Sequence, residues 1–452
     1  MQWTLWYNLI MKTIATISTP IGRGAIAIVR MSGDKALEIA SRIFTTKKLD
    51  NFLNAIPNYM YYGKLDCQDF SDAALAVYFK APNSYTGEDV VEFQCHGGVR
   101  LINEVLKKCI QEGCVPAGKG EFTKRAFLNG KMALSDAEGI IDMINSESIA
   151  SLNAGYRLSK GEIAQKIVEI QTNLLDCISE LEASLDYPEE MEEQAKSNAH
   201  VSISSAIEEL EKLYSTSKVG EYIKQGINVA IIGQANVGKS SLLNALLGRE
   251  RAIVTDIAGT TRDSLEEYVE VQGIMLKLID TAGIRDTDDA VESIGVQKSI
   301  EIAKGSDIIL FVTEAGRDLN DYEKSLIDKF DKNNPIMLVI NKSDKARDSR
   351  KGAHISAKNR QGLEELKNSI VDLFVDKSVD TSGNIITNQR HAQAVKAALE
   401  SVKNALSSFD TMPLECSLVD LKDAYFVLGE ITGSTANEDI INNIFERFCL
   451  GK

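Results

Sequence analysis

The stretch Ile227-Asn-Val-Ala-Ile-Ile-Gly-Gln-Ala-Asn-Val-Gly-Lys-Ser240 decides the fold of the middle of this chain. An apolar run typical of a buried strand leads directly into Gly-x-x-x-x-Gly-Lys-Ser over Gly233–Ser240, and a helical pattern follows over Ser241–Leu247. In this context the glycines let backbone N–H groups turn toward phosphate oxygens, and the helix N-terminus adds positive potential. Lys239 can reach the β- and γ-phosphates, and Ser240 can ligate Mg²⁺. The stretch therefore predicts a P-loop nucleotide-binding domain.

Three further motifs follow in order. Asp280-Thr-Ala-Gly283 ends the apolar run Ile274–Ile279, which puts a carboxylate near Mg²⁺ and a glycine amide near the γ-phosphate. Asn341-Lys-Ser-Asp344 ends a further apolar run, Ile336–Ile340, and Asp344 can accept hydrogen bonds from guanine N1–H and the 2-amino group, neither of which adenine offers. Ile355-Ser-Ala-Lys358 completes the pattern. We expect a doubly wound α/β GTPase domain with the nucleotide at the carboxyl ends of the strands.

The position that carries a water-orienting Gln in Ras-like proteins is apolar here. Ile284 follows Gly283, so another group must orient the water, and the acidic stretch Asp286–Glu292 is the nearest source. Asn236 could help to hold a monovalent cation, which would neutralise transition-state charge in place of an arginine finger. A solvated acidic loop and an ordinary loop asparagine are the alternative interpretations.

Length and composition limit the class of protein. The chain has 452 residues, 44% of them hydrophobic, so it has room for about three domains. No apolar stretch is long enough to span a membrane. The seven cysteines form no Cys-x-x-Cys pair, which excludes a disulfide framework and a zinc finger and favours a reducing cytoplasm. Residues 1–10 lack the features of a signal peptide and are interpreted as a mis-assigned start or a disordered tag.

The net charge argues against a protein that coats nucleic acid. Lys and Arg number 50 against 65 Asp and Glu, or −15. Residues 1–130 hold 15 Lys and Arg against 12 Asp and Glu, a net charge of +3. The rest of the chain holds 35 Lys and Arg against 53 Asp and Glu, a net charge of −18. A polyanion would therefore meet the least repulsion at the N-terminal third.

Two different patterns flank the nucleotide-binding block. Up to about Asn129, short apolar runs alternate with turn residues and predict an α+β domain. Helical periodicity follows, and it returns after the block; each segment has an apolar stripe that needs a partner. We expect the two helical segments to pack on each other, although coiled-coil dimerisation could also cover the stripes. The helical periodicity is carried first by Ile163, Ile167, Ile170, Leu174, Ile178, Leu181 and Leu185 and later by Val395, Leu399, Val402 and Leu406. The predicted domains are 11–130 (α+β), 131–222 (helical, first part), 223–380 (GTPase) and 381–452 (helical, second part).

A family resemblance rests on motifs spread along the chain. The segment Thr255-Asp-Ile-Ala-Gly-Thr-Thr-Arg-Asp263 resembles GTPases with a hydrophobic residue in place of the catalytic Gln. The remaining motifs resemble the MnmE (TrmE) family of tRNA modification GTPases over about residues 13–452. They are Thr19-Pro-Ile-Gly-Arg-Gly24, Ser84-Tyr-Thr-Gly-Glu-Asp-Val90, His96-Gly-Gly98, Gly120-Glu-Phe122, Arg125-Ala-Phe-Leu-Asn-Gly-Lys131 and Phe448-Cys-Leu-Gly-Lys452. Ala235 and Lys119 stand where the family often has Pro, and neither change removes a functional side chain.

The resemblance implies an N-terminal domain that binds 5-formyl-tetrahydrofolate and dimerises. It also implies a homodimer that joins the FAD- and NADH-dependent partner MnmG (GidA) in a heterotetramer. With a folate one-carbon unit, the pair would add an aminomethyl or carboxymethylaminomethyl group to C5 of the wobble uridine, position 34, of certain tRNAs. GTP hydrolysis would depend on potassium and be coupled to dimerisation of the GTPase domains.

The resemblance also assigns residues to these roles. For GTP they are Asn236, Val237, Gly238, Lys239, Ser240, Ser241, Thr255, Asp256, Ile257, Ala258, Gly259, Thr260, Thr261, Asp280, Thr281, Ala282, Gly283, Asn341, Lys342, Asp344, Ser356 and Ala357. The assigned Mg²⁺ ligands are Ser240 and Thr261, and the assigned potassium ligands are Asn236, Thr255, Ile257 (backbone) and Thr260. The assigned catalytic residues are Lys239 and Glu292. Folate falls on Arg30, Glu92, Lys131 and Lys452, with Cys449 as a possible reactive thiol. A carboxylate suits the pterin edge, and cations suit the anionic glutamate tail.

Two other classes share the nucleotide-binding block. A ribosome-assembly GTPase would bind rRNA as a switch, and it would normally carry a basic RNA-binding module such as a KH domain, which is not evident in the sequence. A purely regulatory nucleotide-binding module would have no use for the N-terminal motifs.

Overall fold

The computed structural model describes residues 12–67, 69–248, 266–280, 301, 303–330, 334–375, 383–409 and 411–452. These residues fall into two compact units, and each is described by itself. The first comprises Met1–Ile141, Leu158–Glu169 and Leu428–Lys452, and the second comprises Asp142–Arg157 and Ile170–Val427.

The first unit contains a seven-stranded sheet in the order β3-β4-β5-β6-β2-β1-β7. Its strands are β1 (Ile14–Ile17), β2 (Ile26–Ser32), β3 (Phe44–Thr45), β4 (Met60–Asp66), β5 (Ser71–Phe79), β6 (Val90–His96) and β7 (Val115–Pro116). Alternate residues point to opposite faces of a sheet. The register row Tyr61, Ala76, Phe93, Val29 lies in the core beneath helices α2 (Ala36–Ile43) and α3 (Val99–Gln111), and a short 3₁₀ turn, Phe52–Asn54, adds to it. The predicted α+β domain is confirmed.

The C-terminal residues pack against the same unit. Helices α4 (Glu121–Leu128), α5 (Leu134–Asn145) and α16 (Glu438–Glu446) contribute to one apolar cluster. The rings of Phe445 and Phe448 stack within it at 5.5 Å. Beyond α16, Leu450 forms a β-bridge with Lys119. The end of the described chain therefore lies against the N-terminal residues.

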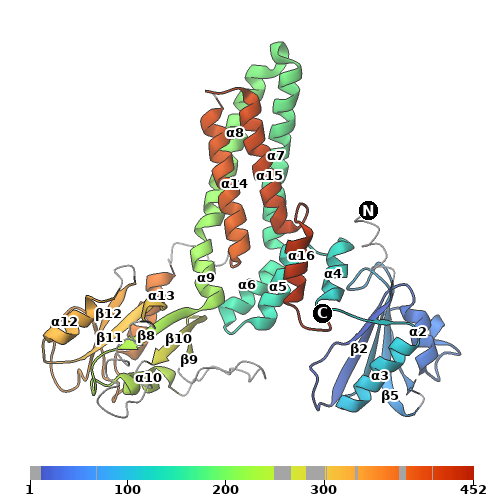
Figure 1. The fold of residues 1–452 in the computed structure, drawn as a ribbon, viewed down its shortest axis with the longest axis horizontal. Coiled ribbons are helices and arrows are strands. Elements are labelled where there is room, and N and C mark those ends of the chain that lie inside the picture. Colours follow the sequence, from blue (N-terminus) through green and yellow to red (C-terminus); the bar gives the residue numbers. More distant parts are fainter. Residues whose placement is uncertain are drawn as a thin grey trace. The chain divides into compact units, whose positions relative to one another are not determined.

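Long helices from both flanks lie side by side, as predicted (Figure 1). They are α7 (Glu162–Asp186), α8 (Pro188–Ser215), α14 (Gln389–Ser408) and α15 (Leu414–Thr432). Within the second unit, Gln171 donates to the Tyr425 carbonyl at 2.8 Å, and Lys403 pairs with Glu211 at 2.5 Å. Of the residues that carry the predicted apolar stripes, Leu185 is 40% exposed and Leu406 is half-buried, and the others are buried. No helix among the described residues combines the length and apolarity needed to cross a membrane.

The inserted block forms a six-stranded sheet in the order β13-β12-β11-β8-β10-β9, in which only β9 runs antiparallel to its neighbour. The strands are β8 (Ile227–Ile232), β9 (Glu266–Val271), β10 (Ile274–Asp280), β11 (Ile308–Glu314), β12 (Ile336–Asn341) and β13 (Ala353–His354). Helices α10 (Lys239–Leu247) and α13 (Leu363–Phe374) pack on one face, and α12 (Asp321–Ile327) packs on the other. The predicted doubly wound α/β fold is confirmed.

The block enters and leaves the helical domain at one place. Helix α9 (Ser217–Gln225) leads into β8, and the backbone N–H of Ile386 donates to Thr216 Oγ1 at 3.1 Å. Helix α6 (Ile149–Ser159) contacts the block from the first flank, where Ala150 N–H donates to the Gly273 carbonyl at 3.1 Å. The insertion inferred from periodicity is therefore confirmed.

Candidate functional sites

The P-loop backbone takes the shape that its glycines allow. Gly233 and Gly238 have φ of +157° and +99°, and Asn236 has φ +64°. A Cβ on Gly238 would lie 2.3 Å from Asn341 Nδ2, and one on Gly233 would lie 2.3 Å from the Val312 carbonyl oxygen. Both positions therefore require glycine because the loop passes so close to neighbouring strands.

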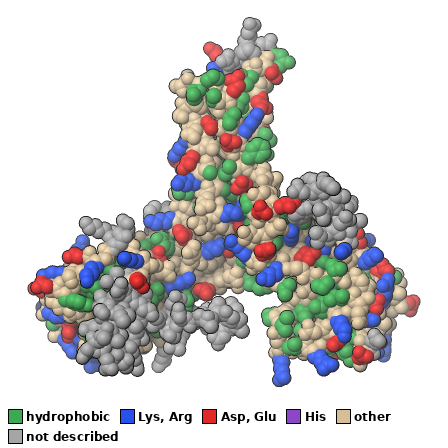
Figure 2. Space-filling view, in the orientation of Figure 1, with side chains coloured by type: hydrophobic (Ala, Val, Ile, Leu, Met, Phe, Trp, Pro, Cys, Tyr) green, Lys and Arg blue, Asp and Glu red, His purple; other side chains and the backbone are tan. Residues whose placement is uncertain are grey.

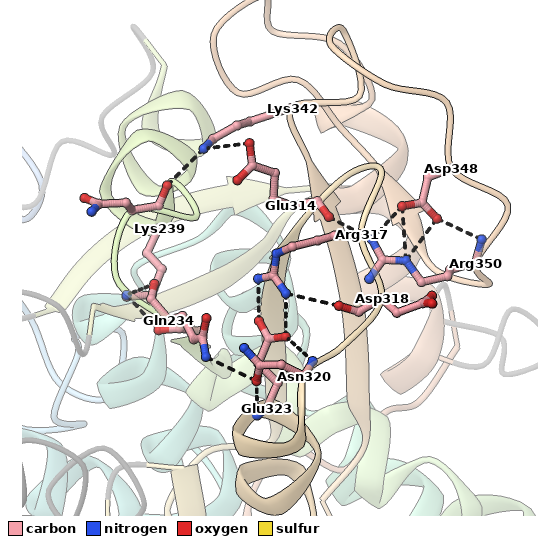
Figure 3. A network of polar contacts seen from close by, with 12 residues as sticks. Gln234, Lys239, Glu314, Arg317, Asp318, Asn320, Glu323, Lys342, Asp348 and Arg350 are labelled. Atoms are coloured by element: carbon pink, nitrogen blue, oxygen red, sulfur yellow. Dashed lines mark hydrogen bonds and ion pairs between the residues drawn. The ribbon is translucent and has the colours of Figure 1, made fainter.

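The P-loop lysine is held across its own loop. Lys239 Nζ donates to the carbonyls of Gly233 and Gln234 at 2.8 and 2.9 Å (Figure 3). Lys342 Nζ reaches the loop from β12, donating to the Asn236 carbonyl at 3.0 Å and pairing with Glu314 at 3.2 Å. Two ammonium groups and the N-terminus of α10 thus converge on one loop, an arrangement that suits an anion such as a polyphosphate.

The residues predicted to surround guanine are brought together. Asn341 is buried; its Nδ2 donates to the Val237 carbonyl at 2.9 Å, and its Oδ1 accepts from the Ala357 N–H at 3.1 Å. Ser356 Oγ donates to Asp344 Oδ1 at 2.6 Å, and this hydrogen bond lowers the pKa of Asp344. The carboxylate is exposed and ionised near neutral pH, as an acceptor of two N–H groups must be.

A polar network that the sequence analysis missed adjoins the P-loop (Figure 3). Arg317 donates to both oxygens of Glu323 at 2.7 Å, and the Glu323 side chain is 0% exposed. Asn320 caps α12 with a capping box, and its Oδ1 also accepts from Gln234 Nε2 at 3.3 Å. Burial raises the pKa of Glu323, but the hydrogen bonds from Arg317 and the Asn320 N–H outweigh this effect and lower it overall. The start of α12 is therefore tied to the second residue of the P-loop, Gln234.

Several predicted site residues lie outside the described residues. They are Thr255, Asp256, Ile257, Ala258, Gly259, Thr260, Thr261, Thr281, Ala282, Gly283, Ile284 and Glu292. The backbone of Asp280 is described and ends β10 at the carboxyl edge of the sheet, next to β8. All of the assigned potassium and Mg²⁺ ligands, including Asn236 and Ser240, and the water-orienting carboxylate stay predictions.

A second site forms around Arg30 in the first unit. Arg30 and Glu92 are register neighbours on β2 and β6, and Arg30 Nε donates to Glu92 Oε1 at 2.6 Å. The guanidinium carbon lies 5.7 Å from the ring centroid of Phe122 and 6.0 Å from that of Tyr85. Arg30 Nη1 also approaches the Gly451 carbonyl at 3.5 Å. The site thus combines an ion pair, two aromatic rings and the C-terminal residues.

The two predicted lysines differ in their placement. Burial lowers the pKa of Lys452, and the charge of Arg30 lowers it further. Arg30 also approaches the carbonyl of the adjacent Gly451, so Lys452 lies close to Arg30. Cys449 is exposed. Lys131 Nζ instead donates to the Pro82 carbonyl at 3.0 Å, in the loop between β5 and β6. The structure therefore brings Arg30, Glu92 and Lys452 together and places Lys131 on a neighbouring loop.

Comparison with known proteins assigns the chain to one family. Residues 134–449 match the family model described as the MnmE helical domain, and residues 13–131 match the one described as the GTP-binding protein TrmE N-terminus. A tRNA modification GTPase MnmE from Finegoldia magna is 40% identical over 97% of this chain and 99% of its own length. The same-named proteins of Acetivibrio thermocellus and Thermoanaerobacter pseudethanolicus are 40% and 41% identical, over 97% and 98% of this chain and 99% and 100% of their own. The chain therefore belongs to the MnmE family, and it is a GTP-hydrolysing enzyme of tRNA modification.

Proposed function

We propose that this enzyme modifies C5 of the wobble uridine, position 34, of certain tRNAs, with a folate one-carbon unit and an FAD-dependent MnmG partner. The observation that supports this most is the site around Arg30. Glu92 offers a carboxylate to the donor edge of a pterin, Tyr85 and Phe122 offer ring faces, and Arg30 and Lys452 offer cations to an anionic glutamate tail. The residues present fit 5-formyl-tetrahydrofolate, which would supply the transferred carbon when bound.

GTP would bind at the carboxyl edge of the second sheet. Lys239 would leave the carbonyls of Gly233 and Gln234 for the β- and γ-phosphates, and Asp344 would accept from guanine. Ser240 and Thr261 would hold Mg²⁺. Potassium would be held by Asn236 with Thr255, Ile257 and Thr260, and Glu292 would orient the attacking water.

The homodimer would use the open face of the N-terminal sheet. The register row Tyr62, Leu75, Gln94, Ile28 lies on the face opposite to the core row. Tyr62 and Ile26 are 68% and 64% exposed, and Figure 2 shows hydrophobic side chains gathered on this unit. Contiguous exposed apolar surface marks an interaction site. Two chains paired in this way would join MnmG in a heterotetramer.

The cysteine pattern favours the cytoplasm as the compartment in which the enzyme works.

Reconstitution tests this proposal. The full chain, MnmG, FAD, NADH, GTP, the folate and unmodified tRNA would be incubated together, and the digested nucleosides would be measured by mass spectrometry. We expect a C5-aminomethyl or carboxymethylaminomethyl uridine that is absent when Lys239→Ala replaces the parent. Unmodified uridine 34 with the parent, in spite of full GTP turnover, would contradict the proposal.

A further inference from the structure

A basic surface adjoins the predicted guanine site on the second unit. Residues 342–360 hold seven Lys and Arg against two Asp, or +5. Of the 50 Lys and Arg and 65 Asp and Glu of the whole chain, 43 and 63 lie outside this segment, so the rest of the chain has a net charge of −20. The exposed cations of this segment, which we call the basic rim, are Lys345, Arg347, Lys351, Lys358 and Arg360.

The first loop of the basic rim has an anchored backbone. The Gly316 N–H donates to Asp348 Oδ2 at 3.0 Å, and Arg350 Nη2 pairs with the same carboxylate at 2.5 Å (Figure 3). Arg350 Nη2 also donates to the Glu314 carbonyl at 2.8 Å, at the end of β11. Asp348 and Arg350 therefore fix the loop that presents Arg347 and Lys351.

The second loop is closed on itself and tied to the first. Ser356 and Gln361 exchange two backbone hydrogen bonds of 3.1 Å, so Lys358 and Arg360 lie in the tight turn between them. Ser356 Oγ links this turn to Asp344 at 2.6 Å. This hydrogen bond lowers the pKa of Asp344, and the charges of Lys345 and Lys358 lower it further. The two loops that carry the cations are thus joined to each other.

These cations differ from their neighbours in their pairing. Lys342 pairs with Glu314, and Arg350 pairs with Asp348. Within the described ranges, none of the five rim side chains forms an ion pair or a side-chain hydrogen bond. An unpaired Lys or Arg that neutralises a phosphate releases a counterion from the nucleic acid, and this release favours binding.

We propose that the basic rim binds phosphates of the tRNA backbone. This inference rests on the tRNA-modifying function and adds the place of contact. Lys and Arg contacts to phosphates position a nucleic acid and carry no sequence information, so one surface would serve every tRNA that the enzyme modifies. Residues 342–360, with a net charge of +5, attract a polyanion, whereas the rest of the chain, with a net charge of −20, repels it. Because the loops are preformed, little ordering cost opposes binding.

A charge-matched pair of triple variants tests the proposal. The rim variant is Arg347→Gln, Lys351→Gln and Arg360→Gln, three side chains that we assign no part in GTP binding. The control variant is Lys304→Gln, Lys324→Gln and Lys329→Gln, exposed cations of the same domain that precede β11 or lie on or just after α12. The dissociation constant of fluorescein-labelled tRNA from the full chain would be measured by anisotropy at several KCl concentrations.

We expect the rim variant to bind tRNA at least about tenfold more weakly at 0.1 M salt. Its slope of log K against log salt should be shallower by about 2 to 3, because each lost phosphate contact removes about 0.7 to 0.9. The control variant should match the parent, and GTP turnover without tRNA should be equal in all three proteins. A rim variant with parental affinity and slope would overturn the proposal, and so would a parent that hydrolyses GTP and binds no tRNA. A rim variant that loses MnmG and keeps tRNA would make the surface a protein interface and would refute it as well. None of these results depends on whether uridine 34 is the modified base.

Discussion

Replacement of Asp344 by Asn tests the predicted guanine site most directly. In the parent, Ser356 Oγ donates to Asp344 Oδ1 at 2.6 Å, which leaves the rest of the carboxylate for the two N–H groups of guanine. In one orientation of the Asp344→Asn side chain, the amide oxygen would keep the bond from Ser356, and the amide NH₂ would face the donors of guanine. In the flipped orientation, one neutral oxygen would have to serve both guanine donors, and the Ser356 proton would lose its acceptor.

Either orientation loses at least one hydrogen bond to a charged acceptor, which contributes about 1.5 to 3 kcal/mol. GDP affinity should therefore fall about 10- to 150-fold. Xanthosine diphosphate has a carbonyl at C2, which can accept from the new NH₂ group, so its affinity should rise relative to that of GDP. The matched control is Asp321→Asn, which makes the same charge change at a fully exposed position on α12.

Equilibrium titration with fluorescent diphosphates avoids hydrolysis during the measurement. The parent should also keep its GDP affinity well into the acid range. The folded-state pKa of Asp344 is lowered, so the ionised acceptor is present above the ordinary carboxyl range and is lost only as the pH falls through the lowered pKa. Parental GDP affinity in the Asp344→Asn variant would refute our placement of the base.

Three further predictions address the other features. At equal ionic strength, GTP turnover in potassium chloride should be well above turnover in sodium chloride, and Asn236→Ala should abolish this difference. Glu292→Ala should slow turnover with little change in GTP affinity. Equal rates of the parent in the two chlorides would exclude the potassium mechanism. Arg30→Ala, or removal of residues 449–452, should weaken 5-formyl-tetrahydrofolate binding at least about tenfold, because a charge-assisted pair is lost. Calorimetry should find the GTP affinity of both variants unchanged. Undiminished folate binding would show that these groups are not part of the site. Of the seven cysteines only Cys416 and Cys449 are exposed, and burial raises the pKa of Cys67 and Cys95 to about 11 and that of Cys114 to about 12. A thiol reagent at pH 8 should therefore label two thiols in the native protein and seven after denaturation. Rapid labelling of more than two thiols in the native protein would contradict the described packing.

The nucleotide-binding block could be predicted from the sequence because its chemistry is local. Gly233–Ser240 connects β8 to α10, and Asn341–Asp344 begins at the last residue of β12, so one local motif places the functional side chains of each segment. The bond between Gln234 and Asn320 joins residues 86 apart, and no local pattern specifies it. One signal was available, since Asn320-Asp-Tyr-Glu323 has the spacing of a capping box.

The site around Arg30 depends even more on tertiary structure. The approach of Arg30 to Gly451 spans 421 residues, and only the family resemblance pointed to it. The family resemblance assigns Lys131 to the same ligand site, whereas its Nζ donates to the Pro82 carbonyl. The assignment of Lys131 to folate stays a prediction.

The insertion of the GTPase domain between the helical flanks has a consequence for synthesis of the chain. Gln171 and its partner Tyr425 are 254 residues apart. At about 5 to 20 residues per second, a ribosome completes α7 roughly 10 to 50 s before it reaches the residues that cover it. Throughout that interval the apolar stripes of α7 and α8 are open to solvent or to chaperones, while the GTPase domain has its own core and can fold in the meantime. Substitutions that enlarge these stripes should therefore reduce the yield of the protein through aggregation on the ribosome, even where the finished molecule would be stable.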